Sequence, residues 1–178
     1  MNRLLKSLFS TTLFSLPLIV TAAPPAMDAK ASIKNALSAA PHKIADHATV
    51  KDWEDHTLRE GTNGWVCYPD MPHTPGNDPM CLDGPWAAWA QGWMSKQKPA
   101  VDKVGVAYML MGGSDASNDD PFAKMPKPGE KWLNAPAHVM IVVPDPKQLD
   151  DLPSDPNSGG PWVMYKGTPY AHIMVPVK

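Results

Sequence analysis

A short pattern of histidine and methionine occurs twice in this sequence. His138 is followed two positions later by Met140, and His172 is followed two positions later by Met174. Each pair lies in an apolar run that predicts a β-strand, in which residues two apart share a face. If the two strands are neighbours, two imidazoles and two thioethers converge into a ligand set suited to copper, whose reduced form prefers soft sulfur. The alternative is structural, because methionine commonly fills cores and an inward histidine commonly bonds to a backbone carbonyl.

A second candidate site is the polar segment 112–121, which follows the most apolar run of the chain after the N-terminus, residues 104–111. Two glycines open the segment and polar side chains follow, as is typical of ligand-binding loops. Groups that could hold a small polar molecule come from Ser114, Asp115, Ser117, Asn118 and Asp119, and all of these except Ser114 are also candidate oxygen ligands for Ca2+. The spacing is not that of an EF-hand. The alternative is that these side chains only shape turns.

The same segment supports a hydrolase hypothesis. Ser114 or Ser117 would be the nucleophile, and His138 or His172 would be its general base. No G-x-S-x-G motif accompanies either serine. A serine oxygen within ~3.2 Å of an imidazole nitrogen would favour this enzyme, whereas a histidine–methionine cluster without such a pair would favour a binding protein.

Three tryptophans recur on one face of a predicted helix that begins near Pro85 and ends before Pro99. Trp86, Trp89 and Trp93 follow the spacing of a helical stripe, which favours packing against a sheet. The alternative is an exposed aromatic surface. Exposure of these indoles would favour a third functional class, an envelope protein that contacts another protein.

Cys67 and Cys81 are the only cysteines, and in an oxidising compartment they predict a disulfide. The alternative is a metal site with His73, but two cysteines 14 apart lack the paired spacing of zinc ligands. Asp70 and Asp78, in the proline-rich loop between the cysteines, are expected to be solvated. No Cys-x-x-Cys-His occurs, which excludes covalently attached haem and leaves noncovalent histidine–methionine ligation open.

The first 22 residues predict a secretory signal peptide. Arg3 and Lys6 precede an apolar run over residues 8–20, and the small-residue pattern that follows predicts cleavage after Ala22. The run is shorter than the ~20 residues of a spanning helix, so we expect a periplasmic or secreted mature chain without a transmembrane segment. A net charge of −2 with no basic run makes nucleic acid and anionic membranes poor partners. The expected partner is a small molecule or a metal ion.

The fold class expected from the remaining pattern is α+β: a mainly antiparallel sheet covered by one or two short helices, rich in loops because of 21 prolines and 12 glycines. After the signal peptide we expect a variable arm, residues 23–47, with a short helix over 31–40, and then one domain, residues 48–178. A three-strand meander is expected from residues 49–53, 57–60 and 65–68. Later strands are expected at 104–111, 137–143, 161–166 and 171–177, with a surface loop over 144–160.

The chain resembles a family of small exported bacterial proteins that have no assigned activity. The resemblance covers residues 48–178 and rests on four motifs, EGTNGW at 60–65, PGNDPMC at 75–81, GGSDASN at 112–118 and GTPYAH at 167–172. It implies that these residues form one unit behind a leader and a variable arm. Because the family has no assigned activity, the resemblance identifies no catalytic residues in this chain.

Overall fold

The computed structural model describes residues 28–129 and 132–177 of the chain. The signal peptide expected over residues 1–22 and the first residues of the expected arm lie outside the described residues. Within the described part, no helix is long and apolar enough to cross a membrane.

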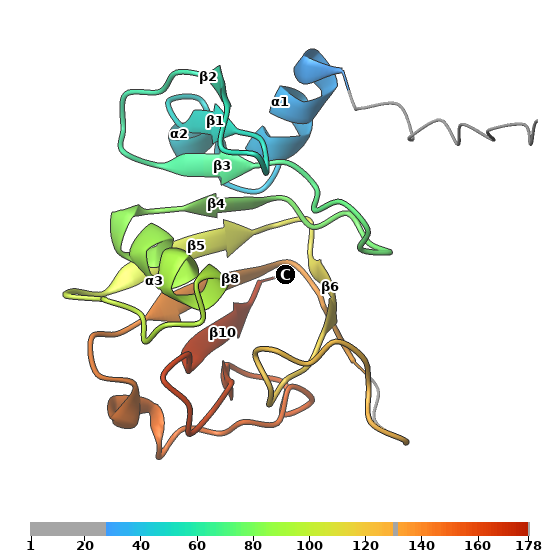
Figure 1. Ribbon diagram of the computed structural model, residues 1–178, viewed down its shortest axis with the longest axis vertical. Coiled ribbons are helices and arrows are strands. Elements are labelled where there is room, and N and C mark those ends of the chain that lie inside the picture. The colour runs from blue at the N-terminus through green and yellow to red at the C-terminus, as the bar shows by residue number, and fades with distance from the viewer. Residues whose placement is uncertain (1–27, 130–131, 178) are drawn as a thin grey trace, which may run out of the picture.

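An eight-stranded sheet organises the fold, with strand order β2-β1-β3-β4-β5-β8-β10-β9 (Figure 1). Neighbouring strands run antiparallel except β1 and β3, which run parallel. Its strands are β1 Thr49–Lys51, β2 Thr57–Arg59, β3 Val66–Tyr68, β4 Met80–Leu82, β5 Gly105–Met109, β8 His138–Val142, β9 Trp162–Met164 and β10 His172–Pro176. A separate pair joins β6 Gly113–Ala116 to β7 Leu133–Ala135. The predicted α+β class with a mainly antiparallel sheet is confirmed.

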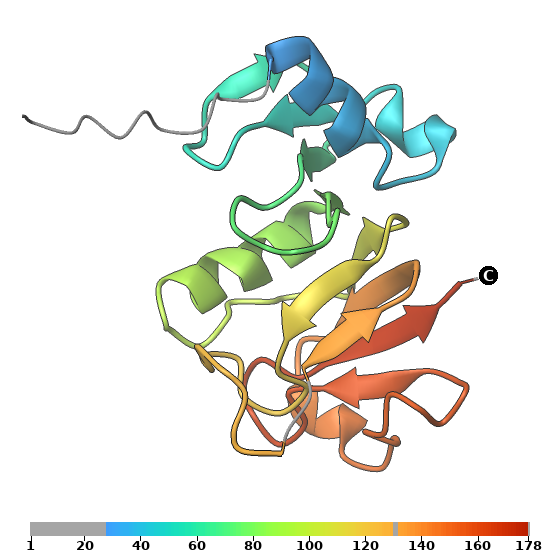
Figure 2. The ribbon, with the colours of Figure 1, turned by 90° about the vertical axis from the view of Figure 1, so that its right-hand side faces the viewer.

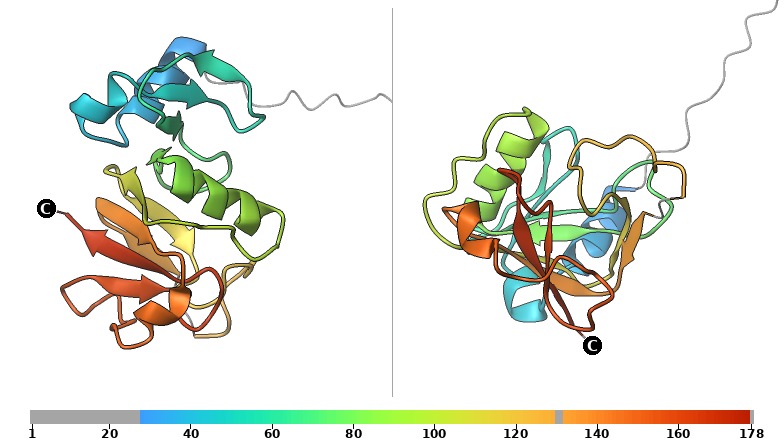
Figure 3. Two further views of the ribbon diagram at one scale, coloured as in Figure 1. Left: turned by 90° about the vertical axis from the view of Figure 1, so that its left-hand side faces the viewer. Right: turned by 90° about the horizontal axis from the view of Figure 1, so that it is seen from below.

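Helices cover both faces of the sheet, at different places (Figures 2 and 3). They are α1 Ala29–Leu37, α2 His42–Ala45, α3 Gly84–Met94 and the short 3-10 helix η1 Pro146–Leu149. One core cluster joins α3 to β4, β5, β8, β9 and β10. A second joins α1 and α2 to β1, β3 and β4. Because Leu82 of β4 belongs to the first cluster and its neighbour Cys81 to the second, α1 and α3 pack on opposite faces.

The first three strands do not form the predicted meander. β1 pairs antiparallel with β2 on one side and parallel with β3 on the other, so β1 lies in the middle. Between β2 and β3 the chain crosses back at Gly61, which lies against the backbone of Ala48 and Thr49 and leaves no room for a Cβ atom. The amide of Thr62 then donates to the carbonyl of His47 at 2.7 Å. This close crossing places β3 on the far side of β1.

Short strands were also missed where loops were expected. β4 and β7 are three residues each, too short to show a periodic pattern. The segment 112–121, expected to be a loop, begins with β6, which pairs with β7 outside the eight-stranded sheet. The strands expected around residues 104–111, 137–143, 161–166 and 171–177 are present as β5, β8, β9 and β10.

The predicted disulfide between Cys67 and Cys81 is confirmed. The two cysteines lie directly opposite each other on β3 and β4, and both are fully buried. They pack beneath Ala36 of α1, whose carbonyl lies 3.7 Å from the Cys81 sulfur. The bridge therefore ties β3 to β4 at the base of the proline-rich loop, next to α1.

Asp83 fastens the beginning of α3 to the sheet. Its Oδ1 accepts a hydrogen bond from the amide of Trp86 at 2.9 Å, which caps the helix. Its Oδ2 accepts from the amide of Val106 on β5 at 2.7 Å. One carboxylate thus fixes where α3 lies over the sheet.

Replacing Asp83 tests this attachment. We expect Asp83→Ala to lower the free energy of unfolding by about 2 kcal/mol, because a cap and a charge-assisted hydrogen bond are lost together. The matched control is Asp145→Ala, which removes only the exposed cap of η1 and is expected to cost about 0.5–1 kcal/mol. Urea denaturation of both variants measures the difference. Equal losses would contradict the second role of Asp83.

Candidate functional site

Two rows of side chains cross the sheet face that α3 covers. In one row, Met109 of β5 lies opposite His138 of β8. In the next, Met140 of β8 lies opposite Met174 of β10. Since directly paired residues share a face, these side chains all point toward α3, and so does His172, two residues before Met174. The strands that carry the repeated histidine–methionine pattern are therefore neighbours.

The two imidazoles nevertheless do not converge. The register pairs His138 with Pro176, which lies four residues beyond His172 on β10. Four residues of extended strand span about 13 Å. His172 instead pairs with Met164 of β9, on the other side of β10. The four-residue copper set expected from the sequence is consequently not assembled around one ion.

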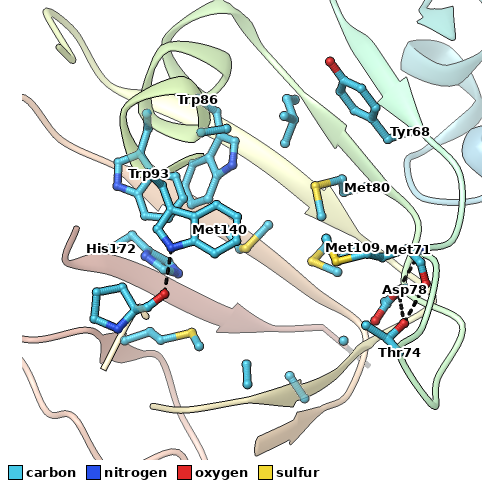
Figure 4. Close-up of a pocket in the computed structure, with 18 of the residues that line it drawn as sticks. Tyr68, Met71, Thr74, Asp78, Met80, Trp86, Trp93, Met109, Met140 and His172 are labelled. Atoms are coloured by element: carbon cyan, nitrogen blue, oxygen red, sulfur yellow. Dashed lines mark hydrogen bonds between the residues drawn. The ribbon is translucent and has the colours of Figure 1, made fainter. Parts of the chain in front are cut away.

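A cleft of about 490 Å3 lies between the sheet face and α3 (Figure 4). Trp86 and Trp93 lie on its helix side, and Met80, Met109 and Met140 lie on its sheet side. Residues of β6, β7 and the segment after β6 also line it. A cleft of this volume with aromatic and apolar walls is of the size that holds a small molecule.

His138 is 1% exposed and carries an unpaired acceptor in the wall of this cleft. Its Nδ1 lies 2.7 Å from the carbonyl oxygen of Pro136, so Nδ1 bears the proton and donates. Its Nε2 is buried without a hydrogen-bond partner. Burial lowers the pKa of His138, with the Pro136 carbonyl opposing the shift, and the ring is therefore neutral at pH 7.

His172 has the surroundings of a packed core histidine. Its ring makes edge contacts with Trp86, Trp89 and Tyr165, with ring centroids 5.1–5.4 Å apart. Its Nδ1 lies 3.0 Å from the carbonyl oxygen of Tyr170. Burial lowers the pKa of His172 to about 4, and the hydrogen bond to the Tyr170 carbonyl opposes the shift. This ring positions the tryptophans that form the helix side of the cleft.

The tryptophan stripe serves both as core and as cleft wall. Trp86 and Trp89 are buried and their rings stack at 5.2 Å, and Trp93 continues the stack at 6.4 Å from Trp89. The indole Nε1 of Trp93 donates to the Pro121 carbonyl at 2.9 Å, which ties the segment after β6 to α3. Because Trp86 and Trp89 are buried and Trp93 is only partly exposed, the exposed aromatic surface that would favour an envelope interaction protein is not formed.

Both candidate serines use their hydroxyls elsewhere. Ser114 donates to Asp78 at 3.0 Å and accepts from the amide of Gly76 at 3.0 Å. Ser117 is buried and accepts from the amides of Asp119 and Asp120 at 3.3 and 3.1 Å. Among the described hydrogen bonds, neither serine pairs with a histidine. The geometry set out for a hydrolase is therefore not formed.

Asn118 is the remaining member of the polar segment whose hydrogen bonds hold structure. Asp115 lies within β6, and Asp119 is exposed. The Asn118 side chain accepts from the indole of Trp162 at 3.1 Å and donates to the carbonyl of Ser154 at 3.0 Å. These bonds link the segment to β9 and to the loop before it, which fits the turn-shaping alternative better than a polar ligand site.

Asp78 corrects the expectation that the acids of the disulfide loop are solvated. It is 5% exposed and accepts from the amide of Met71, the hydroxyl of Thr74 and the hydroxyl of Ser114. Burial raises the pKa of Asp70, and the neighbouring Asp78 side chain adds to the shift. The network joins the loop to β6 and closes one end of the cleft.

Sequence reasoning missed Met80 and Met109. β4 is too short to show a period, and Met109 reads simply as part of an apolar strand. The only sequence signal for a methionine-lined site was composition, since 11 methionines are many for a chain of this length. In the structure, most of the described methionines line the cleft. Strand register, which the sequence does not show, decides which of them meet His138.

A separate acidic group lies on the turn between β1 and β2. One ligand atom each from Asp52, Glu54 and His56 lie within 4.8 Å of one another. The group is largely exposed, and its histidine already pairs with Asp52 at 3.0 Å. These side chains also shape the turn, because Asp52 accepts from the amides of Glu54 and His56.

Comparison with protein-family models, with curated proteins and with solved structures found no match to this chain. The resemblance to small exported bacterial proteins therefore stays a prediction. Function is inferred from the cleft and its side chains.

We expect the buried histidines to lower the free energy of unfolding in mild acid. Because the folded pKa of His172 is about 4 and an unfolded histidine titrates near 6.5, the unfolded chain gains a proton first as the pH falls. His172 alone then removes about 3 kcal/mol of stability between pH 6.5 and pH 4. Urea denaturation at several pH values should show a shallower pH slope in His172→Phe. The control His42→Gln, at a fully exposed ring, should keep the parent slope, and an unchanged slope in His172→Phe would contradict the prediction.

Proposed function

We propose that this chain is an exported binding protein whose cleft holds a small, mainly apolar molecule. The observation that carries the proposal is the cleft of about 490 Å3 between α3 and the sheet, walled by tryptophan and methionine. Filled cores leave few voids larger than a water molecule, so an apolar space of this size is suited to a ligand.

The shape and chemistry of the walls favour an aromatic or otherwise flat ligand. The stacked rings of Trp86, Trp89 and Trp93 offer indole surface along the helix side. Methionines on the sheet side have flexible, polarisable side chains that adapt to ligand shape. Such walls bind a ligand through buried apolar area and complementary shape, and they need few polar groups.

Charge narrows the ligand class further. The charged side chains among the described lining residues are aspartates: Asp52, Asp55, Asp78 and Asp120. No lysine or arginine belongs to the described lining. Lys51 already pairs with Asp55 at 2.7 Å, so a carboxylate, sulfonate or phosphate on the ligand would find no free lysine or arginine among the described lining residues. The ligand we propose is neutral or positively charged.

Export is supported by two features. The predicted signal peptide directs the chain out of the cytoplasm, and the buried Cys67–Cys81 disulfide is of the kind that persists in an oxidising compartment. A binding protein in that compartment would meet its ligand in the periplasm or the medium. The small polar ligand considered from the sequence is less well supported, because Ser114, Ser117 and Asn118 already make hydrogen bonds within the fold.

Fluorescent probe binding tests the proposal. N-phenyl-1-naphthylamine, a neutral aromatic amine, should gain fluorescence on binding and quench the tryptophans, whereas its sulfonated analogue 8-anilino-1-naphthalenesulfonate should bind at least ten-fold more weakly. Ala90→Phe, on the cleft side of α3, should raise the dissociation constant of the neutral probe at least ten-fold by filling the space. Ala88→Phe, on the same helix outside the lining, is the matched control and should leave it within two-fold.

Two results would contradict the proposal. One is a neutral probe that fails to bind at saturating concentration. The other is binding that Ala90→Phe and Ala88→Phe weaken equally, which would place the probe outside the cleft.

A further inference from the structure

The unpaired nitrogen of His138 marks one corner of the cleft as chemically distinct from the rest. An acceptor buried without a donor is costly, so the few that occur in a folded chain call for a partner. Nε2 of His138 is buried with no hydrogen-bond partner, and the whole residue is 1% exposed. The cleft is the space that this ring lines.

The ring is held in the state that a metal requires. Nδ1 of His138 faces the Pro136 carbonyl at 2.7 Å, which fixes the proton on Nδ1 and leaves the Nε2 lone pair free. Metal-bound histidines are oriented in this way, with the distal ring N–H donating to a carbonyl or carboxylate. The orientation exists here without any rearrangement of the backbone.

Methionines lie next to His138 on the same sheet face. Met109 is the direct cross-strand neighbour of His138. Both side chains reach Gly113, where a Cβ atom would lie 3.4 Å from His138 Cε1 and 3.9 Å from the Met109 sulfur. The pairing of Cys81 with Tyr108 sets Met80 beside Met109, one strand further.

Met140 completes the surroundings, two residues after His138 on the same strand face. Figure 4 shows the side chains of Met80, Met109 and Met140 turned into the same part of the cleft. The side chains that line this part of the cleft thus offer one imidazole nitrogen and three thioether sulfurs.

This donor set selects a soft ion of low charge. Thioethers bind Cu(I) and related soft ions well and bind Zn2+, Mg2+ and Ca2+ poorly. The imidazole and the thioethers are all neutral, so these ligands do not neutralise the charge of an ion bound among apolar walls. A divalent ion pays a far larger desolvation cost there than a monovalent one. Asp78, which closes the end of the cleft, already accepts three hydrogen bonds and is not needed as a ligand.

We propose that His138 Nε2 and the sulfur of Met109, joined by the sulfurs of Met80 and Met140, bind one monovalent soft metal ion, copper(I). This site retains two members of the set expected from the sequence, His138 and Met140, and replaces the other two by residues that the strand register supplies. It goes beyond the proposed binding of an apolar molecule and does not depend on it.

Silver(I), a redox-inert ion of the same softness, is the first probe. Because the only two cysteines form the disulfide, no thiol competes for it. Titration in chloride-free buffer should give one equivalent bound. Met109→Leu, which keeps the packing volume, should weaken silver binding at least ten-fold. Met125→Leu removes an exposed methionine outside the cleft lining and should leave the affinity within two-fold.

Histidine-resolved 15N NMR identifies the ligand nitrogen without a variant at His138. The Nε2 resonance of His138 should shift on adding silver, and that of His172 should not. Copper(I), held reduced by ascorbate and measured by competition with bicinchoninate, should follow the same order among the variants, whereas Zn2+ should not bind at this corner.

Three results would overturn the proposal: silver binding that Met109→Leu leaves unchanged, a shift at His172 in place of His138, or no silver bound at one equivalent. The last would mean that water or an organic donor satisfies Nε2. Binding of N-phenyl-1-naphthylamine is measured separately, so failure of the metal site and failure of the apolar cleft are distinguishable.

Discussion

Backbone pairing among β5, β8 and β10 fixes which side chains face α3. A shift of one residue in that pairing would turn His138, Met140 and Met174 to the opposite face, where Tyr108 and Ile141 now lie. Asp83 then fixes the position of α3 over the sheet, because its carboxylate accepts hydrogen bonds from both the first turn of the helix and β5. Cleft, tryptophan stack and unpaired imidazole all depend on these two constraints.

The side of the sheet under α3 is built differently from the side under α1. Small alanines and the disulfide fill the contact with α1. Under α3, large rings and long thioethers meet across a space they do not fill. Two buried polar atoms, Trp89 Nε1 and His138 Nε2, are left without partners there. Since unfilled volume and unpaired polar atoms both cost stability, their coincidence in one place is typical of a site that a ligand completes.

Local patterns in the sequence predict much of this arrangement. The alternation at 138–142 and 172–176 predicts two strands with histidine and methionine on one face, and the tryptophan spacing predicts a helix to cover it. Compartment and cysteine count predict the disulfide. Register is not a local property: the offset that separates His138 from His172 and brings Met109 to His138 comes from long-range pairing. The parallel pairing of β1 with β3 depends likewise on a tight crossing at Gly61.

The most direct test of the central claim, that an open apolar cleft separates α3 from the sheet, is xenon binding in a crystal. Xenon enters apolar cavities without polar anchors and is located by its anomalous scattering. Density for xenon between Trp89 and the methionines of β5 and β8 is the result predicted. A crystal in which these side chains close on one another, with no xenon between α3 and the sheet, would contradict the claim.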